Sequence, residues 1–162
     1  MAAEIIKVGM AELKVARHPA ILTTLGLGSC IGIALYDRKT KNIGLVHIML
    51  PSSAIATAHA NRAKFADTGI HDLVEEMKGI GSDVKNIVAK IAGGAQMFSF
   101  ASQNDSMKIG QRNIEATKAV LAELNIPIIA EDTGGNYGRT IELSSEDGVL
   151  KVKTIGFGIK YL

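Results

Sequence analysis

Two apolar segments separated by a short polar turn constrain the fold of this chain most strongly. Residues 30–36 (CIGIALY) read as a strand, and residues 43–50 (IGLVHIML) form a second strand that Pro51 ends. The six residues between them (DRKTKN) have the composition of a turn. The pattern therefore predicts an antiparallel hairpin.

The apolar side chains of this hairpin select one register. If the ends of the polar turn 37–42 pair with each other, Ile31 lies opposite Ile48 and Ile33 lies opposite Val46. This register gathers the best core residues on one face. A slip by one residue would transfer every side chain to the other face, so the apolar pattern specifies the pairing strongly.

The opposite face of the same hairpin brings Cys30 and His47 together. Gly32 faces His47 in this register, and Cys30 becomes its diagonal neighbour, within roughly 7–8 Å along the backbone. Gly32 and Ala34 are expected to leave open space beside the imidazole. The chain has one cysteine, and the other histidines (His18, His59 and His71) lie in polar surroundings or on the expected wet face of a helix.

The rest of the chain alternates between strand-like and helical patterns. Helices are predicted over residues 61–78 and 111–124 from their apolar stripes. Further strands are predicted at 5–15 (as one or two), 86–92, 127–130, 139–143 and 149–154, with a turn feeding a strand at 22–29 and loops at 52–60 and 99–108. A single α+β domain spanning 1–162 follows, with helices packed on a mixed, largely antiparallel sheet.

Composition excludes several classes of function. The 18 basic and 16 acidic residues are dispersed and give a formal charge of +2, so nucleic-acid binding has little support. No apolar stretch approaches the ~18 residues needed to cross a membrane, and the first residues do not read as a signal peptide. One cysteine forms no internal disulfide and the histidines show no zinc-ligand spacing, which predicts a cytoplasmic protein without a metal.

The segment that leads into Cys30 is typical of a reactive thiol rather than of a packed one. A lone cysteine is most often a small buried hydrophobic residue. Here, however, Gly26 and Gly28 allow a sharp bend directly before Cys30, which can expose backbone N–H groups near Ser29 as an oxyanion hole. With His47 as general base, the expected chemistry is acyl transfer through a thioester. Thr24 or a backbone carbonyl could orient the imidazole, and no resolving cysteine supports a redox sensor.

The motifs along the chain resemble those of the CheD family. The resemblance rests on residues 24–30 (TLGLGSC), 46–51 (VHIMLP), 64–68 (KFADT), 91–98 (IAGGAQMF), 109–113 (IGQRN) and 131–139 (EDTGGNYGR). It implies a glutamine deamidase that acts on methyl-accepting chemoreceptors without a cofactor, and methylesterase activity has also been ascribed to the family. It places the nucleophile, base and supporting threonine on Cys30, His47 and Thr24, with backbone support from Gly28 and Ser29.

The same resemblance implies a fold similar to the catalytic domain of cytotoxic necrotizing factor toxins, an α/β sandwich. It also implies that the chain binds the CheC phosphatase, and an alternative function is a binding module that stimulates CheC. Two roles of Arg139 stay open at this point, because it could position substrate or brace the turn at Asp132. Gly93-Gly94 and Gly134-Gly135 are expected to permit tight turns.

Overall fold

Two five-stranded sheets and two helices make up the part of the chain that the computed structural model describes, residues 3–54, 56–57, 60–96 and 108–162. The outer sheet has the order β1 (Glu4–Lys7), β3 (Ala20–Leu27), β8 (Arg139–Ser144), β9 (Leu150–Thr154) and β10 (Gly158–Tyr161). The central sheet has the order β2 (Leu13–Ala16), β5 (Ile43–Ile48), β4 (Ile31–Asp37), β6 (Ile87–Gly93) and β7 (Ile128–Thr133). The helices are α1 (Ala66–Gly79) and α2 (Ile109–Glu123), with short 3-10 turns η1 (Arg62–Lys64) and η2 (Val84–Asn86).

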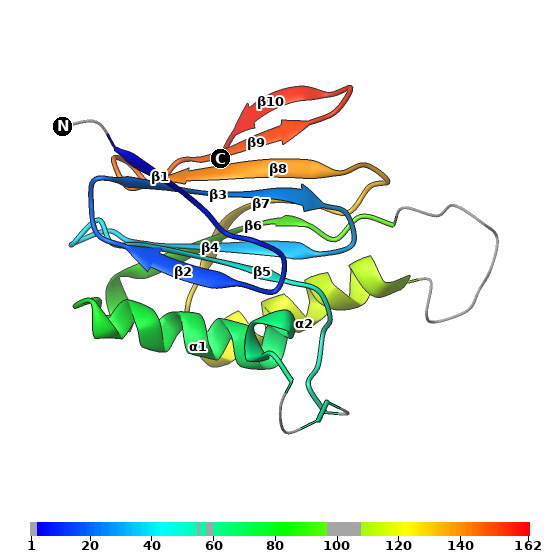
Figure 1. Ribbon diagram of the computed structural model, residues 1–162, viewed down its shortest axis with the longest axis horizontal. Helices are drawn as coiled ribbons and strands as arrows, with labels where there is room; N and C mark the ends of the chain where they lie inside the picture. Colours follow the sequence, from blue (N-terminus) through cyan, green and yellow to red (C-terminus); the bar gives the residue numbers. More distant parts are fainter. Residues whose placement is uncertain (1–2, 55, 58–59, 97–107) are drawn as a thin grey trace.

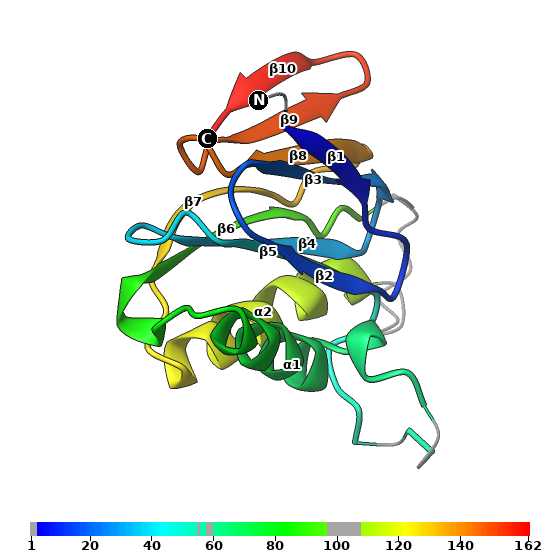
Figure 2. The same ribbon diagram turned by 60° about the vertical axis from the view of Figure 1, so that its left-hand side comes forward.

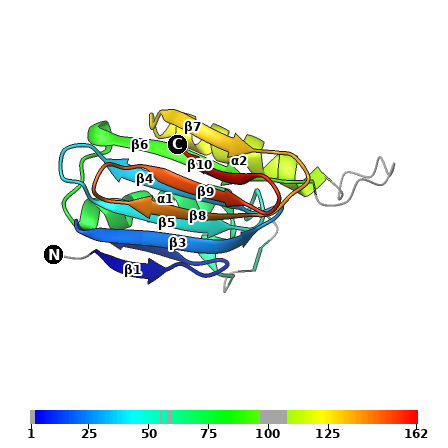
Figure 3. The same cartoon turned by 90° about the horizontal axis from the view of Figure 1, so that it is seen from above.

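The elements stack in three layers (Figures 1 and 2). The outer sheet covers one face of the central sheet, and both helices cover the other face. Seen from above, the strands of the outer sheet lie over those of the central sheet and run in roughly the same direction (Figure 3). Strand β4 lies in the middle of the central sheet, so six of its seven residues are buried. Cys30 directly precedes this strand.

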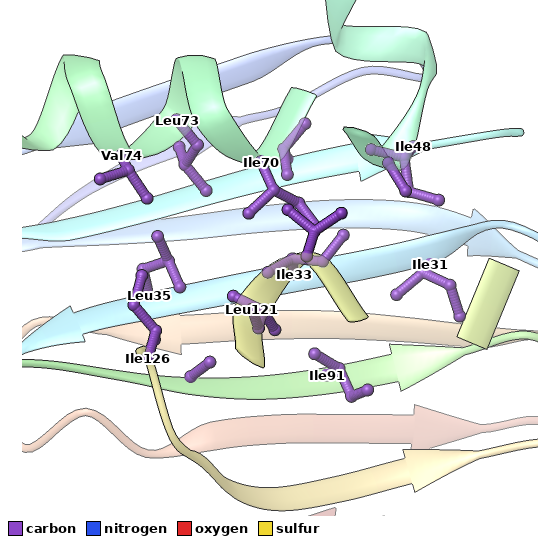
Figure 4. Close-up of a cluster of buried hydrophobic side chains, with 14 of the residues drawn as sticks. Ile31, Ile33, Leu35, Ile48, Ile70, Leu73, Val74, Ile91, Leu121 and Ile126 are labelled. Carbon is purple, nitrogen blue, oxygen red and sulfur yellow. The ribbon is translucent and has the colours of Figure 1, made fainter. Parts of the chain in front are cut away.

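The helix-side core is built from the face of the hairpin that carries the isoleucines. Ile31, Ile33 and Ile48 pack with Ile70 and Leu73 of α1, and all five are fully buried (Figure 4). Both helices bury one apolar stripe against this face, as the spacing of their apolar residues requires. The other face of the hairpin is therefore directed toward the outer sheet.

The second core lies between the two sheets. It contains Leu22 and Leu27 of β3, Ile141 of β8, and Ala34 and Leu45 of the central sheet. Gly32 allows the sheets to approach, because a Cβ at this position would lie 2.6 Å from the Cδ1 atom of Ile141. The expectation of open space beside Gly32 was therefore wrong, since a side chain of the facing sheet fills it.

The predicted hairpin register is confirmed. Strands β4 and β5 pair antiparallel with Ile31 opposite Ile48, Ile33 opposite Val46 and Gly32 opposite His47. The predicted α+β class with mostly antiparallel strands is also confirmed, with β1–β3 and β6–β7 as the parallel pairs. The single mixed sheet was wrong, because the strands divide into two sheets.

Several boundaries also differ from the sequence prediction. Residues 5–15 form two strands in different sheets, and residues 20–27 form a full strand rather than a turn feeding one. Strand β10 was not predicted. The predicted loops at 52–60 and 99–108 fall partly on residues 55, 58–59 and 97–107. These residues, which include His59, lie outside the described part of the chain. None of the helices in the described ranges has the length and apolar character needed to cross a membrane.

Candidate active site

The tight turn between β3 and β4 carries Cys30. Gly26 adopts a φ of 69°, which side chains other than glycine rarely adopt, and its carbonyl accepts the Gly28 N–H at 3.1 Å. The turn delivers Cys30 to the start of the central strand, where the residue is 8% exposed. The sharp bend predicted from the glycines is thus present.

Backbone bonds to the segment after β6 hold this turn in place. The Ala95 N–H donates to the Gly28 carbonyl and the Gly94 N–H donates to the Cys30 carbonyl, each at 2.8 Å. Gly93 has a φ of 115°, and a Cβ on it would collide with the Cys30 carbonyl oxygen. A glycine is therefore required where the β6 chain passes Cys30.

His47 is completely buried and points from β5 toward the outer sheet. Its Nδ1 lies 2.7 Å from the Thr24 Oγ1 of β3, which also lies 2.7 Å from the Val8 carbonyl oxygen. A carbonyl can only accept, so the single hydroxyl proton of Thr24 goes to Val8. The Thr24 oxygen must then accept a proton from His47, and the neutral imidazole carries its hydrogen on Nδ1.

This tautomer leaves the second ring nitrogen as a base. With Nδ1 protonated, the Nε2 atom of His47 has a free lone pair, and it has no hydrogen-bond partner among the described residues. Cys30 belongs to the cluster between the sheets, the same side toward which His47 points. The predicted placement of thiol and imidazole on one face of the hairpin therefore agrees with the structure.

Burial determines the resting protonation of both groups. Removal from water raises the pKa of the Cys30 thiol, against a smaller opposing effect of a hydrogen bond from its own backbone N–H. Removal from water also lowers the pKa of His47. Both shifts favour the neutral form at neutral pH, the thiol of Cys30 and the imidazole of His47.

The two backbone residues predicted to support the site have distinct surroundings. The N–H of Gly28 is used within the turn, and the Ser29 carbonyl accepts a hydrogen bond from Asn113 Nδ2 at 2.9 Å. The turn thus has its carbonyls fixed by β6 and α2. This rigidity is what an oxyanion hole made of backbone N–H groups would need.

Arg139 braces the turns around the site. Its side chain is fully buried and donates to the carbonyl oxygens of Gly93 and Gly134 at 3.3 and 2.8 Å, and it pairs with Asp132 at 3.4 Å. It also lies over the ring of Tyr137, 4.5 Å from the centroid. These contacts support the bracing role and place the guanidinium against the β6 segment that holds Cys30.

Sequence reasoning missed one residue beside the site. Asn113 was not counted among the inward residues of the second helix, yet it is fully buried, and its Nδ2 bonds the carbonyls of Ser29 and Met49. A signal was present, because Asn113 lies four residues before the buried Thr117 and thus on the same helical face.

The arrangement can support acyl transfer by a thiol. It contains a thiol on a rigid turn, an imidazole of defined tautomer, and a hydroxyl that is hydrogen-bonded to that imidazole. Within the described part of the chain, no group of three or more His, Cys, Asp and Glu side chains is placed to hold a metal ion. Fold and site together define an α+β protein with a buried thiol–imidazole centre between two sheets.

Comparison with known proteins assigns the chain to a family. The family model described as CheD chemotactic sensory transduction matches residues 49–154. A protein of Caldanaerobacter subterraneus subsp. tengcongensis named probable chemoreceptor glutamine deamidase CheD is 60% identical over 162 residues, which is all of both chains. The chain therefore belongs to the CheD family.

Further relatives carry the same name without the qualifier. The chemoreceptor glutamine deamidase CheD of Halalkalibacterium halodurans is 52% identical and covers 97% of this chain and 98% of its own. That of Bacillus subtilis is 48% identical, with coverages of 98% and 96%. Among solved structures, the hypothetical protein YfiH of Bacillus licheniformis matches with a TM-score of 0.47 and 16% identity, over 75% of this chain and about half (49%) of that one.

Proposed function

We propose that this chain is a chemoreceptor glutamine deamidase in which Cys30 is the nucleophile, His47 the general base and Thr24 the residue that orients the base. The names of relatives that match over nearly the whole chain support the reaction and the substrate. The observation that carries the residue roles is the chain of bonds from Val8 through Thr24 to His47, because it leaves Nε2 ready to accept a proton.

The reaction begins with the substrate glutamine against the Cys30 turn. The thiol proton passes to His47 Nε2 as the sulfur attacks the carboxamide carbon. The oxygen of that carbon becomes negative and is held by the backbone N–H groups of Ser29 and Cys30, while Gly28 shapes the turn. The imidazolium then gives its proton to the amide nitrogen, and ammonia leaves a thioester.

Hydrolysis completes the cycle through the same base. His47 takes a proton from water as the water oxygen attacks the thioester carbon. The proton returns to the Cys30 sulfur as the carbon–sulfur bond breaks, and the substrate side chain leaves as glutamate. Because the resting pair is neutral, proton transfer accompanies the attack on substrate rather than preceding it.

Mass spectrometry tests this proposal directly. Each deamidation adds about one dalton, since an NH₂ group is replaced by OH. Incubation of a purified receptor signalling fragment with the wild-type protein should produce this gain at defined glutamines, and Cys30→Ala should abolish it. His71→Ala, a change at an exposed residue of α1, serves as the matched histidine control and should retain full activity. Equal mass gain with wild type and Cys30→Ala would refute the proposed nucleophile.

Two further expectations from the family resemblance belong to this proposal. The chain 1–162 would act as one domain in the cytoplasm, where receptor signalling regions and a reduced Cys30 coexist. It would also bind the CheC phosphatase. A CheC phosphatase assay with Cys30→Ala separates the two activities, because stimulation that persists without deamidation assigns the binding role to a surface independent of the thiol.

A further inference from the structure

The pairing between the strand that follows Cys30 and the strand of His47 ends directly before Cys30 and one residue beyond His47. The described ladder of β4 and β5 ends with Ile31 opposite Ile48. Beyond this pair the two chains take different partners. The N–H groups of Met49 and Leu50 donate to the Lys64 carbonyl at 2.7 and 3.0 Å, whereas the Cys30 carbonyl accepts from Gly94. The two strands therefore separate where the chemistry would take place.

One side-chain amide bridges this separation. Asn113 Nδ2 donates to the Ser29 carbonyl at 2.9 Å and to the Met49 carbonyl at 3.0 Å. Ser29 directly precedes Cys30, and Met49 follows His47 by two residues. The two hydrogens of one planar amide thus hold the two chain segments at a set separation.

The helix that carries Asn113 is itself closely fitted to the site. A Cβ on Gly110 would collide with the carbonyl oxygens of Gly94 and Ala95, and a Cβ on Gly94 would collide with the Ile114 side chain. Backbone contact of this kind leaves α2 little freedom to slide along the central sheet. The first turns of α2 therefore hold the Asn113 side-chain amide in a fixed position.

The hydrogen bonds of Asn113 hold the backbone beside the site but do not satisfy all of the polar atoms of its own side chain. The residue is fully buried, yet its Oδ1 has no hydrogen-bond partner among the described residues, which costs free energy in a protein interior. A residue selected only for packing would not carry this cost. Both of its bonds go to the backbone beside Cys30 and His47.

We infer that Asn113 is a positioning residue, which sets the distance and orientation between the Cys30 thiol and the His47 imidazole. This inference rests on the proposed function. It assigns a role in the reaction to α2, an element that contributes none of the groups proposed to touch the substrate. A shift of about 1 Å between nucleophile and base can lower a rate by roughly 100-fold, so loss of the amide should act mainly on kcat.

The chain provides a matched control in Asn42, at the opposite end of the same hairpin. Asn42 is also buried, and its Nδ2 also makes two bonds, to the Ile80 carbonyl at 3.2 Å and to Ser82 Oγ at 3.1 Å. Asn113→Ala and Asn42→Ala thus remove the same group with the same number of bonds. Only the first removal lies beside the thiol and imidazole.

Deamidation kinetics on the receptor fragment, together with thermal unfolding, form the first arm of the test. Asn113→Ala should lower kcat by roughly 10- to 100-fold with little change in KM. Asn42→Ala should lower Tm by a similar amount and leave kcat unchanged below the unfolding transition. Equal kcat losses in the two variants would overturn the inference. If Asn113→Ala does not fold, two other variants replace it. Asn113→Ser keeps one donor, and Gly110→Ala displaces the helix and keeps the amide. Each should lower kcat more than Asn42→Ala does.

Alkylation of Cys30 by iodoacetamide forms the second arm and needs no deamidase activity. If Asn113 acts by aligning thiol and imidazole, Asn113→Ala should slow alkylation in the wild-type background and have no further effect in a His47→Ala background. Independent, multiplicative effects would overturn the inference. Absence of deamidation by wild type together with this coupling would refute the proposed function and leave the positioning role standing.

Discussion

The Oγ1 atom of Thr24, in the outer sheet, lies 2.7 Å from the Nδ1 atom of His47, in the central sheet. This bond joins the two sheets at a completely buried point, and the direction of its proton is determined by the Val8 carbonyl on the far side of the hydroxyl. A threonine outside the hairpin thus decides which nitrogen of the base is available.

Replacement of Thr24 should separate the effect of its hydrogen bond to His47 from the effect of the volume that its side chain fills. Thr24→Val keeps the shape and removes the acceptor, so the imidazole loses its fixed tautomer and kcat for deamidation should fall by roughly 10- to 100-fold. Thr24→Ser keeps the hydroxyl and should retain most of the rate. Steady-state kinetics on a receptor fragment provide the measurement, and equal rates for the valine and serine variants would contradict the role of the bond.

The acid limb of the activity profile should lie below the ordinary histidine range. Burial lowers the pKa of His47 from the ordinary histidine value of 6.5, so the imidazole stays neutral and able to accept a proton at pH values where an exposed histidine is already charged. The midpoint of the acid limb of the kcat/KM profile should therefore lie below pH 6.5. A midpoint above 6.5 would show that His47 is not the base or that another group dominates.

The same lowered pKa should make folding sensitive to acid. In the unfolded chain His47 is protonated near the ordinary histidine value of 6.5, whereas folded His47 is not, so the unfolded state binds more protons below this pH. The contribution of His47 to stability is thus complete above pH 6.5 and is lost as pH falls toward its folded pKa. Urea unfolding between pH 7 and 5 should give a steeper loss for wild type than for His47→Gln, which keeps a donor for Thr24 and does not titrate.

Alanine at Gly93 should damage both the fold and the site. A residue with a side chain is strained at a φ of 115°, which costs about 1–2 kcal/mol, and the new Cβ would also displace the Cys30 carbonyl. Gly81 is the control, because it has a φ of 104° with open space around the missing Cβ. Gly81→Ala should show the strain alone and keep its activity, whereas Gly93→Ala should lose more stability and nearly all deamidation. Similar unfolding free energies and similar deamidation rates for Gly93→Ala and Gly81→Ala would contradict a role for the close contact between Gly93 and the Cys30 carbonyl.

A comparison of the unfolding free energies of single and double variants should show that the buried Arg139 and Asp132 are coupled. Removing the guanidinium leaves Asp132, which is 8% exposed, with the more distant Lys160 at 3.7 Å as its one cation among the described residues. Arg139→Met should therefore cost about 3 kcal/mol. Adding Asp132→Asn removes the charge left unpaired and should recover part of this loss. Chemical denaturation measures both, and strictly additive losses would argue against a coupled pair.

Local pattern was sufficient for the hairpin and for both helices. The alternation of Ile31, Ile33, Val46 and Ile48 has one register that places all four side chains on the same face, because a slip by one residue moves a strand's side chains to the opposite face, and the structure adopts it. Strand β10 escaped prediction for the opposite reason. All four of its residues are exposed, so no alternation of buried and exposed positions marks them.

The sequence by itself determined which residues share the inner face of the hairpin, and it pointed to Cys30 and His47 as a pair. Only the tertiary structure decided that Thr24 orients the imidazole and that Asn113 bridges the strands where their pairing ends. Strand register is a local property with a period of two residues, which can be read along the chain. The bond of Thr24 to His47 and that of Asn113 to Ser29 join residues 23 and 84 positions apart, and such contacts form only when the layers pack.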